Sequence, residues 1–411
     1  MDPQSVLLAH VTGAPNSRQA ARALLDAGCL SACHGSLAWN APPQWWRLLP
    51  GSVRTFLQKR LFSELQGARL INHPIPEFLR LCRPWAGTSN AAGWFSIERI
   101  NQMFDQAVAR DLEESGATAV YGYFDTSLFT FREAKRLGLR TIYELPTPYW
   151  RATKRFVTAA RQSRPEWADT LPSPEELSES GPRRDEELRL ADLVVVPSDF
   201  VKDSLDEAPP FLAPVEVVPY GCPHVVKHDH HVPCEGMPLR LLFAGTVSQS
   251  KGLADLLEAI DPLGGQIELS VAGDFAGVGQ VAQIIGKPQV RFLGRLPHAS
   301  LLEVMRRQDV CVLPTWYEGL SLVLLEAMSQ GLPVLTTVNS GLAGLIEEGR
   351  QGWLVPVGSP LAIRERLEKI LFEPSSLLSN SAEAAEWARR HSWGIYRQRL
   401  QQALNARLSM T

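Results

Sequence analysis

Residues 310–337 form a buried strand, a short loop and a helix in direct succession, an order that restricts the chain to a small group of folds. The apolar run at residues 310–313, bounded by proline, has the length of a buried strand. Ser321 is a good N-cap, residues 322–328 are mostly strong helix formers, and Gly-Leu-Pro at residues 331–333 ends the helix. This order predicts an α/β sheet that binds ligands at the carboxyl ends of its strands.

The loop of this unit carries groups that suit a bound anion. Backbone N–H groups of Gly319, Leu320 and Ser321 are expected to be free at the helix N-terminus. Glu318 in the loop and Glu326 on the helix flank them, and carboxylates accept hydrogen bonds from vicinal sugar hydroxyls. A sugar nucleotide would satisfy all three features. From spacing alone, an amphipathic core helix with two solvated glutamates is an equal alternative.

The same residues resemble the nucleotide-sugar motif of retaining glycosyltransferases of family four, also called glycosyl transferase group 1. The matching segments are Glu-Gly-Leu-Ser-Leu at 318–322, Leu-Glu-Ala-Met at 325–328 and Gly-Leu-Pro-Val at 331–334. The resemblance implies an α/β GT-B fold, in which two Rossmann-like parallel-sheet domains face a cleft and C-terminal helices cross back to the N-terminal domain. It also implies that Glu318 holds sugar hydroxyls beside the anomeric carbon and that Glu326 binds the ribose diol.

A chain of 411 residues is too long for one ordinary core and fits two domains. A net charge of -3 gives no case for nucleic-acid binding, which requires a clustered basic excess. With the resemblance, the expected division is an N-terminal acceptor domain (1–222), a linker (223–238), a C-terminal donor domain (239–380) and returning helices (381–411).

The cysteines and the N-terminus favour a cytoplasmic protein. The six cysteines are scattered through a long chain, which is untypical of a disulfide framework. The first residues lack the basic segment of a signal peptide, and no apolar run approaches 18 residues. We therefore expect a cytoplasmic protein. Peripheral attachment to the inner face of the membrane is an alternative that the sequence leaves open.

The N-terminal half opens as strand, loop and helix, and a later pair of strands ends in acidic residues. By resemblance, Gly13 and Asn16 in the first loop would lie near the donor phosphates or the acceptor. Asp125 and Glu144 follow two predicted strands, where ligand-contacting residues of such sheets usually lie. Either carboxylate could orient the acceptor hydroxyl, and helix capping is the alternative for Asp125.

Residues 45–62 mix tryptophan, leucine, phenylalanine and arginine. Such a segment could lie on an anionic membrane, with aromatic side chains in the interface and basic side chains towards the head groups. The alternative is a helix that packs on its own domain with a solvated basic face.

Two connecting segments complete the prediction of secondary structure. Residues 151–181 are expected to form a polar, proline-containing excursion from the N-terminal domain, and residues 341–348 a short helix.

The linker holds the densest cluster of metal-ligand residue types. They suit Zn²⁺, but their spacing matches no two-pair zinc motif, so an exposed polar linker is the alternative. The resemblance implies no metal at this crossover, and we expect no cofactor and no essential metal. The residues are Cys222, His224, His228, His230, His231 and Cys234.

The resemblance also extends to the first strand, glycine loop and helix of the C-terminal half. There Lys251 would place an ammonium beside the donor diphosphate. The family often has an arginine earlier in this loop, where this chain has Thr246 and Ser250, so the missing cation could come from Arg295. The expected donor-binding set therefore also includes Gly245, Thr246, Ser250, Arg295 and Leu296.

These observations predict a hexosyltransferase that uses a nucleotide diphosphate sugar, UDP- or GDP-linked, and acts with retention. The acceptor would be a hydroxyl of a glycan, a lipid-linked saccharide or a small molecule. Two alternatives keep the same donor pocket: a sugar-nucleotide epimerase or hydrolase, and a non-catalytic nucleotide-sugar binding module.

Overall fold

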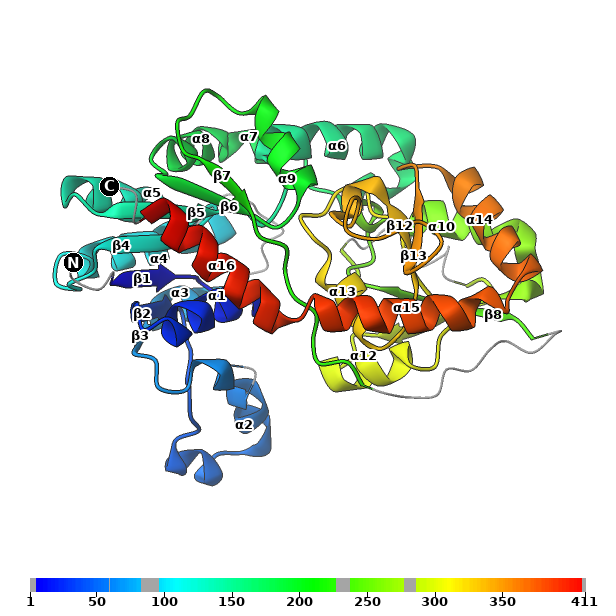
Figure 1. Ribbon diagram of the computed structural model, residues 1–411, viewed down its shortest axis with the longest axis horizontal. Coiled ribbons are helices and arrows are strands. Elements are labelled where there is room, and N and C mark those ends of the chain that lie inside the picture. Colours follow the sequence, from blue (N-terminus) through cyan, green and yellow to red (C-terminus); the bar gives the residue numbers. More distant parts are fainter. Residues whose placement is uncertain (1–4, 59, 83–95, 227–236, 277–285, 409–411) are drawn as a thin grey trace.

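A computed structural model describes residues 5–58, 60–82, 96–226, 237–276 and 286–408 (Figure 1). It contains a seven-stranded sheet of order β3-β2-β1-β4-β5-β6-β7 and a six-stranded sheet of order β10-β9-β8-β11-β12-β13. All strand pairs within these sheets are parallel. The predicted pair of Rossmann-like domains is confirmed.

The N-terminal domain builds its sheet from apolar strands that helices cover. Strand β6 is entirely valine and leucine and entirely buried, as expected for a parallel strand with both faces covered. The strands are β1 (Val6–Ala9), β2 (Leu30–Gly35), β3 (Leu70–Asn72), β4 (Ala119–Tyr123), β5 (Arg140–Glu144), β6 (Leu193–Val196) and β7 (Val215–Val217). The helices are α1 (Pro15–Asp26), α2 (Gly51–Gln58), α3 (Pro74–Cys82), α4 (Ile97–Asp111), α5 (Leu128–Arg136), α6 (Trp150–Ser163), α7 (Pro174–Glu179), α8 (Gly181–Arg189) and α9 (Asp199–Ser204).

The C-terminal domain repeats this plan around a shorter sheet. The strand, loop and helix predicted at residues 310–329 are present as β11 and α13, with Ser321 at the N-cap position. The strands are β8 (Leu239–Ala244), β9 (Ile267–Ala272), β10 (Val290–Gly294), β11 (Val310–Leu313), β12 (Val334–Thr337) and β13 (Gly352–Val355). The helices are α10 (Leu253–Ile260), α12 (His298–Met305), α13 (Leu322–Ser329) and α14 (Pro360–Phe372).

Two final helices connect the domains, as the resemblance implies. Helix α15 (Ser376–Arg390) packs on α13, and α16 (Trp393–Leu408) crosses to the N-terminal domain and packs along α1 (Figure 1). There Arg397 donates a hydrogen bond to the Gln19 side chain at 2.6 Å, and Gln401 donates one to the Ala23 carbonyl at 2.6 Å. The C-terminus therefore ties the two domains together.

One prediction of connecting structure is wrong, that of a helix at residues 341–348, and the structure adds detail to another. The excursion at residues 151–181 is largely helical, and its helix α6 packs against Trp316 and Tyr317 of the C-terminal domain. Residues 341–348 form turns rather than a helix, and a 3₁₀ segment, Val338–Ser340, precedes them.

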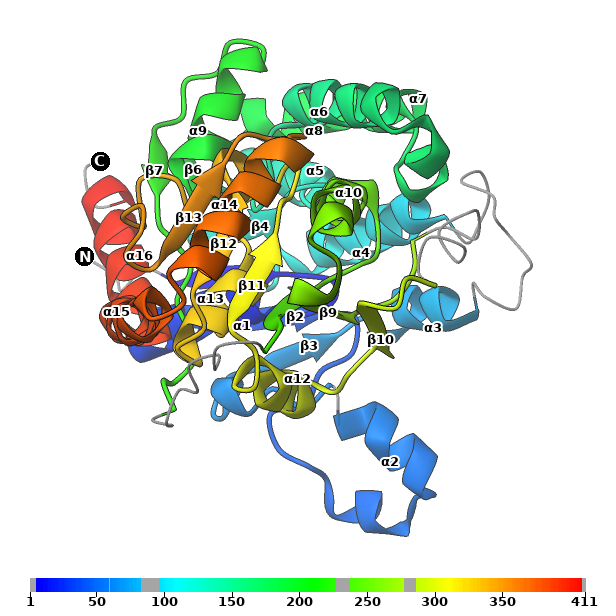
Figure 2. The same cartoon turned by 90° about the vertical axis from the view of Figure 1, so that its right-hand side faces the viewer.

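Helix α2 lies on a lobe that projects from the N-terminal domain in both views (Figure 1, Figure 2). The lobe has aromatic packing of its own, because buried Trp46 meets Trp39 edge-on with ring centroids 5.5 Å apart. Arg47 and Arg54 are exposed on it. Among the described helices, none combines the length and apolar character needed to cross a membrane.

Candidate active site

The loop that carries Lys251 is fastened to the carboxyl end of β11. Gly252 has a φ of +73°, and a Cβ at this position would lie 2.0 Å from the carbonyl oxygen of Pro314. The Ser250 carbonyl accepts hydrogen bonds from the Trp316 amide at 2.9 Å and from the Thr315 hydroxyl at 2.8 Å. Glycine thus allows two backbone segments to touch, and their contact places Lys251 beside the loop that carries the first glutamate.

Lys251 and Glu318 form an ion pair at this point. Their side chains remain 24% and 21% exposed, so both groups are accessible to solvent. Burial lowers the pKa of Lys251 to about 8. The adjacent carboxylate favours the ammonium form, so Lys251 is charged at neutral pH. The structure thus brings together the two residues that the sequence assigns to catalysis.

The expected free amides at the start of α13 need one correction. The Ser321 amide donates a hydrogen bond to the Ser340 carbonyl at 3.2 Å and is therefore engaged. Gly319 lies against the N-terminal domain: a Cβ there would be 1.8 Å from the Pro146 carbonyl oxygen, and its own carbonyl accepts a 2.5 Å hydrogen bond from Ser198. The loop that contains Gly319 and Leu320 is thus also a contact between the domains.

Glu326 faces a cavity of about 520 Å³ between the domains. Its Oε1 lies 3.0 Å from Nε2 of His298 at the start of α12. This hydrogen bond raises the pKa of His298. The cavity is lined by Pro15, Arg18, Gln19 and Glu64 from the N-terminal domain, Gly221 and Pro223 before β8, His298, Leu322 and Glu326 from the C-terminal domain, and Trp393 of α16.

Arg18 and His298 share this cavity with Glu326, and the sequence reasoning missed both. Arg18 also pairs with Glu64 at 3.1 Å, and its charge reaches His298, where it opposes protonation. One signal was available: Arg18 follows closely on the start of α1, and a cation near a helix N-terminus opposes the helix dipole.

The remaining donor-side residues lie on loops around the C-terminal strands. The Gly245 amide donates to the Ala272 carbonyl at 2.9 Å, which holds the β8 loop against β9. Thr246 is exposed. Arg295 is 78% exposed and pairs with Asp274 at 3.3 Å, while Leu296 packs against the core. As placed, Arg295 neutralises a neighbouring acid and does not line the cavity at Glu326.

The amides of the first N-terminal loop are engaged within the domain. The Gly13 amide donates to Nδ1 of His10 at 2.9 Å, and the Thr12 amide donates to the same atom at 3.2 Å. The loop is nevertheless adjacent to the cavity, because Pro15 lines it. A role for Gly13 at the donor phosphates stays a prediction.

Asn16 and Glu144 belong to a buried polar cluster. Glu144 accepts hydrogen bonds from Asn16 at 2.8 Å, Tyr121 at 2.7 Å and Tyr220 at 2.9 Å. Burial raises the pKa of Glu144. Both predicted acceptor-side residues are thus satisfied by protein partners. They connect β5, α1 and the segment after β7, rather than presenting free groups to a ligand.

Asp125 forms a bidentate ion pair with Arg184, at 2.6 and 2.9 Å. The capping role considered for it belongs to Glu187, whose carboxylate accepts from the Ser127 amide at 3.0 Å and the Leu128 amide at 3.1 Å. Burial raises the pKa of Glu187 to about 8. Asp125 has a φ of 65°, an uncommon conformation for a residue other than glycine.

The ends of β4 and β5 border a second, aromatic cavity of about 190 Å³. It adjoins the Asp125 loop, since Phe124 and Arg184 line it. Its other aromatic side chains are Tyr143, Tyr149 and Trp150.

The linker cluster lies mostly outside the described residues, namely at His228, His230, His231 and Cys234. Cys222 is buried, and its amide donates to the His391 carbonyl at 2.7 Å. In the part of the chain that the structure describes, neither Cys222 nor His224 belongs to a group with metal-binding geometry.

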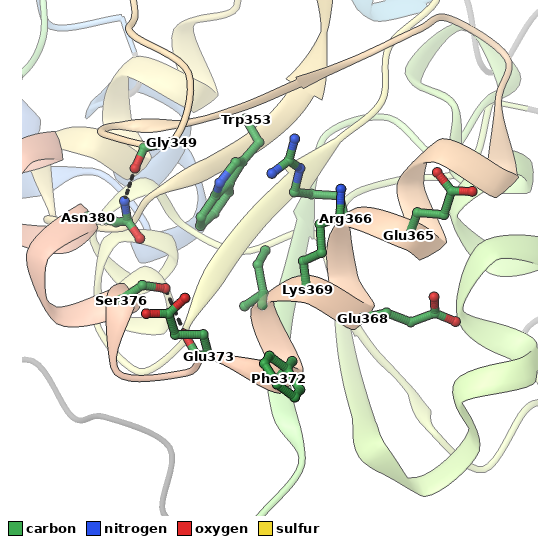
Figure 3. A pocket seen from close by; sticks show the side chains of 11 residues that line it. Gly349, Trp353, Glu365, Arg366, Glu368, Lys369, Phe372, Glu373, Ser376 and Asn380 are labelled. Atoms are coloured by element: carbon green, nitrogen blue, oxygen red, sulfur yellow. Dashed lines mark hydrogen bonds between the residues drawn. The ribbon is translucent and has the colours of Figure 1, made fainter.

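A further pocket, of about 690 Å³, lies on the C-terminal domain between α14 and the start of α15 (Figure 3). Figure 3 shows Trp353 in it, with charged side chains of both signs, including Glu365, Arg366 and Lys369, around the mouth. None of its lining residues belongs to the predicted site.

Comparison with known proteins shows what the C-terminal domain is similar to. Residues 238–373 match the family model described as glycosyl transferases group 1. A putative colanic acid biosynthesis glycosyltransferase, WcaL of Salmonella typhimurium, is 31% identical over 150 residues, which are 33% of this chain and 37% of WcaL. A D-inositol 3-phosphate glycosyltransferase of Corynebacterium glutamicum is 28% identical over 174 residues, 38% of this chain and 42% of that protein. The chain thus matches less than half the length of these curated relatives.

Solved structures match over nearly the whole chain. Sucrose-phosphate synthase from Thermosynechococcus elongatus has a TM-score of 0.69 at 17% identity and covers 99% of this chain and 100% of its own. HepE of Anabaena, in complex with UDP and glucose, has a TM-score of 0.63 at 14% identity and covers 98% of this chain and 100% of its own. The GT-B fold and the resemblance to group 1 glycosyltransferases are confirmed.

Proposed function

We propose that this chain, whose residues 238–373 match the group 1 glycosyltransferases, moves a hexosyl group from a nucleotide diphosphate sugar to an acceptor hydroxyl. The donor is UDP- or GDP-linked, and transfer retains the anomeric configuration without an essential metal. The acceptor is a glycan, a lipid-linked saccharide or a small molecule. One observation carries the proposal: the Lys251–Glu318 pair and the Glu326 cavity lie along one edge of the C-terminal sheet, next to the N-terminal domain.

In this proposal Lys251 stabilises the leaving nucleoside diphosphate. Negative charge grows on the bridging oxygen as the glycosidic bond breaks, and a fixed ammonium nearby lowers the energy of that state. Glu318 leaves the ammonium to accept hydrogen bonds from the sugar hydroxyls. Contact between the domains at Gly319 keeps water away from the anomeric carbon, where it would compete with the acceptor.

Glu326 takes the ribose diol at the entrance of the 520 Å³ cavity. A carboxylate can accept two hydrogen bonds at once, which suits vicinal hydroxyls. His298 holds the Glu326 carboxylate in place before the donor arrives. When the ribose binds, His298 either leaves Glu326 or stays bonded to it beside the ribose. The UDP bound by Anabaena HepE supports a uridine nucleotide as the first donor to test.

Arg18 is the best placed candidate for the cation that the loop at Thr246 and Ser250 lacks. It lines the cavity together with Glu326, whereas Arg295 is largely exposed and paired with Asp274. When a diphosphate binds, Arg18 would exchange the Glu64 carboxylate for this more highly charged partner. This assignment makes the N-terminal domain part of the donor site.

The aromatic cavity near Asp125 is the proposed acceptor side. Tyr149 and Trp150 form part of its wall, and an acceptor would meet the apolar surface of the half-buried Trp150. Tyr149 is buried, and its hydroxyl and the Trp150 indole N–H both donate hydrogen bonds to Asp185. Arg184 supplies a fixed charge at its wall.

Isothermal titration with a panel of UDP- and GDP-sugars tests the donor site. Glu326→Ala should weaken binding of the preferred donor by about 1.5–3 kcal/mol, the scale of a lost hydrogen bond to a charged group. Glu303→Ala, which removes an exposed glutamate from α12, should leave the affinity unchanged. Unchanged affinity in a folded Glu326→Ala protein would remove Glu326 from the ribose role.

The same titrations separate the two candidate arginines. Arg18→Ala should weaken donor binding and should affect the nucleoside monophosphate less than the diphosphate, because the guanidinium is assigned to the phosphates. Arg295→Ala should have the smaller effect. The reverse order would assign the missing cation to Arg295.

Product analysis with and without acceptor distinguishes transfer from its alternatives. An epimerase or hydrolase forms product without any acceptor, and a binding module forms none with any acceptor. The loop without arginine at Thr246 and Ser250 is the observation that favours the binding module. Acceptor-dependent release of nucleoside diphosphate, with an α-configured product from an α-configured donor, supports retaining transfer.

A further inference from the structure

Two histidines and an aspartate from separate segments converge at the edge of the N-terminal sheet. His34 lies on β2, His73 directly follows the edge strand β3, and Asp111 is the last residue of α4. The His34 and His73 side chains, 39 residues apart in the chain, stack with ring centroids 5.2 Å apart. None of the three residues lines the cavities described above.

The three side chains direct one potential ligand atom each towards a common point. Nδ1 of His34 and Nε2 of His73 lie 3.0 Å apart, and Oδ2 of Asp111 lies 3.8 and 3.7 Å from these atoms respectively. A triangle with sides of 3.0, 3.8 and 3.7 Å has a circumradius of about 2.0 Å. Zn²⁺ is bound by imidazole nitrogen and carboxylate oxygen at roughly 2.0–2.2 Å. The cluster therefore has room for a cation at bonding distance from all three atoms.

The charge states of the residues suit a cation. Burial, with smaller contributions from His73 and Arg69, lowers the pKa of His34 to about 3, and burial also lowers the pKa of His73. The neutral imidazole, which burial favours, is the form that binds metals. The His34 side chain is fully buried and His73 is 12% exposed, but Asp111 is 44% exposed, so an ion can enter from its side.

A shared proton explains only part of this arrangement. A hydrogen bond accounts for the 3.0 Å contact between the histidines, but the 3.7 and 3.8 Å separations from Asp111 are too long for hydrogen bonds. Atoms that bind one ion commonly lie at such separations. Nε2 of His34 has no hydrogen-bond partner among the described residues in either arrangement, so it does not distinguish the two.

We infer that His34, His73 and Asp111 bind one Zn²⁺ ion, with water in the fourth position on the exposed side. Two imidazoles and one carboxylate are a common ligand set for this metal. The ion would join β2, the end of β3 and the end of α4, and so would brace the outer edge of the N-terminal sheet. The inference is independent of the proposed transfer reaction, because no ligand belongs to the donor or acceptor side.

The test is zinc binding by the full chain, prepared without a histidine tag. Stripped protein is dialysed against Zn²⁺, and bound metal is measured by mass spectrometry and by competition with a chromophoric chelator. The wild type should retain one tight ion per chain. Asp111→Asn, which keeps the size of a half-exposed side chain, and His73→Ala should each weaken that binding, by at least the roughly 10- to 100-fold typical of altered metal surroundings.

The linker histidines provide the matched control, because they are the competing explanation for any bound zinc. The triple variant His228→Ala, His230→Ala, His231→Ala should retain the tight ion. Loss of zinc in this triple variant but not in Asp111→Asn would overturn the inference. So would a wild type that binds no zinc at micromolar concentration, which would leave the two histidines as a hydrogen-bonded pair.

A second measurement does not depend on stoichiometry. Zn²⁺ should raise the Tm of the wild type, because a ligand that binds only the folded state stabilises it, and should not raise that of Asp111→Asn. Circular dichroism of the metal-free proteins shows whether each variant folds. Equal zinc-induced shifts in two folded proteins would contradict the site. Co²⁺ in place of Zn²⁺ should give the visible bands of a four-coordinate ion only in the wild type.

Discussion

Gly252→Ala tests whether the contact between the lysine loop and β11 positions the proposed catalytic pair. The alanine Cβ would lie 2.0 Å from the Pro314 carbonyl oxygen, whereas ordinary contacts begin at 3.4 Å. The two backbone segments must therefore separate by more than ~1 Å, because this contact is shorter than an ordinary one by that amount. Ser250 and Lys251 immediately precede the substitution and move with it.

The cost has two parts. An alanine in the left-handed conformation costs about 1–2 kcal/mol. Separation of the segments also breaks the hydrogen bonds from Thr315 and Trp316 to the Ser250 carbonyl, each worth about 0.5–1.5 kcal/mol. The sum is about 2–5 kcal/mol of stability. Displacement of Lys251 by about 1 Å should lower turnover by up to ~100-fold.

Gly344→Ala is the matched control. Gly344 lies in the same domain with a φ of +78°, but a Cβ there would meet nothing within 4 Å. It should cost only the conformational part, about 1–2 kcal/mol, and should leave turnover unchanged. Urea denaturation followed by tryptophan fluorescence gives the stabilities, and nucleoside diphosphate release at saturating donor gives turnover. Equal stability losses in the two variants, or normal turnover in folded Gly252→Ala, would refute the reasoning.

Three further predictions concern the active-site charge, the domain contact and the projecting lobe. The value of kcat/KM should fall as pH rises through about 8, where the half-buried Lys251 loses its proton, and Lys251→Arg should remove this decline. A flat wild-type profile up to the ordinary lysine pKa of 10.5 would contradict the assignment. Asp255→Ala should lower stability by ~3–5 kcal/mol in thermal denaturation, since it removes the buried acceptor shared by Arg164, Trp316 and Gln249. Glu258→Ala removes an exposed partner of the same arginine and should cost less than ~1 kcal/mol; similar losses would argue against the buried cluster. If residues 45–62 contact a membrane, the protein should float with anionic liposomes, and added salt should weaken this binding. Absence of binding at low salt would exclude the contact.

The strand, loop and helix at residues 310–329 could be predicted because their signals are local. An apolar run, an N-cap residue and a Gly-Leu-Pro stop act within a few residues of the backbone that they shape. The motif from Glu318 to Glu326 could be recognised for the same reason, because its residues are close together in the sequence. The length of the chain indicated two domains, the family resemblance added the returning helices, and the structure contains both.

The partners of the site residues could not be predicted in this way. Ser321 was expected to offer a free amide, but the chain turns back after β12 and supplies the Ser340 carbonyl. Asn16 and Glu144 are both residue types that often contact ligands. In the structure they lie together, and Asn16 donates a hydrogen bond to Glu144. The sequence drew attention to histidines in the linker, while His34 and His73, which are 39 residues apart, form the cluster with metal-binding geometry.

The division between the two kinds of information follows from the range of the forces involved. Local backbone conformation depends largely on neighbouring residues, so the order of most elements and the Glu318 to Glu326 motif were readable along the chain. Whether a polar group faces a ligand or a protein partner depends on contacts between distant segments, such as Gly252 with Pro314 or Gly319 with Pro146. Only the packed structure joined Lys251 to Glu318 and placed Arg18 in the cavity of Glu326, because the domain interface brings those segments together.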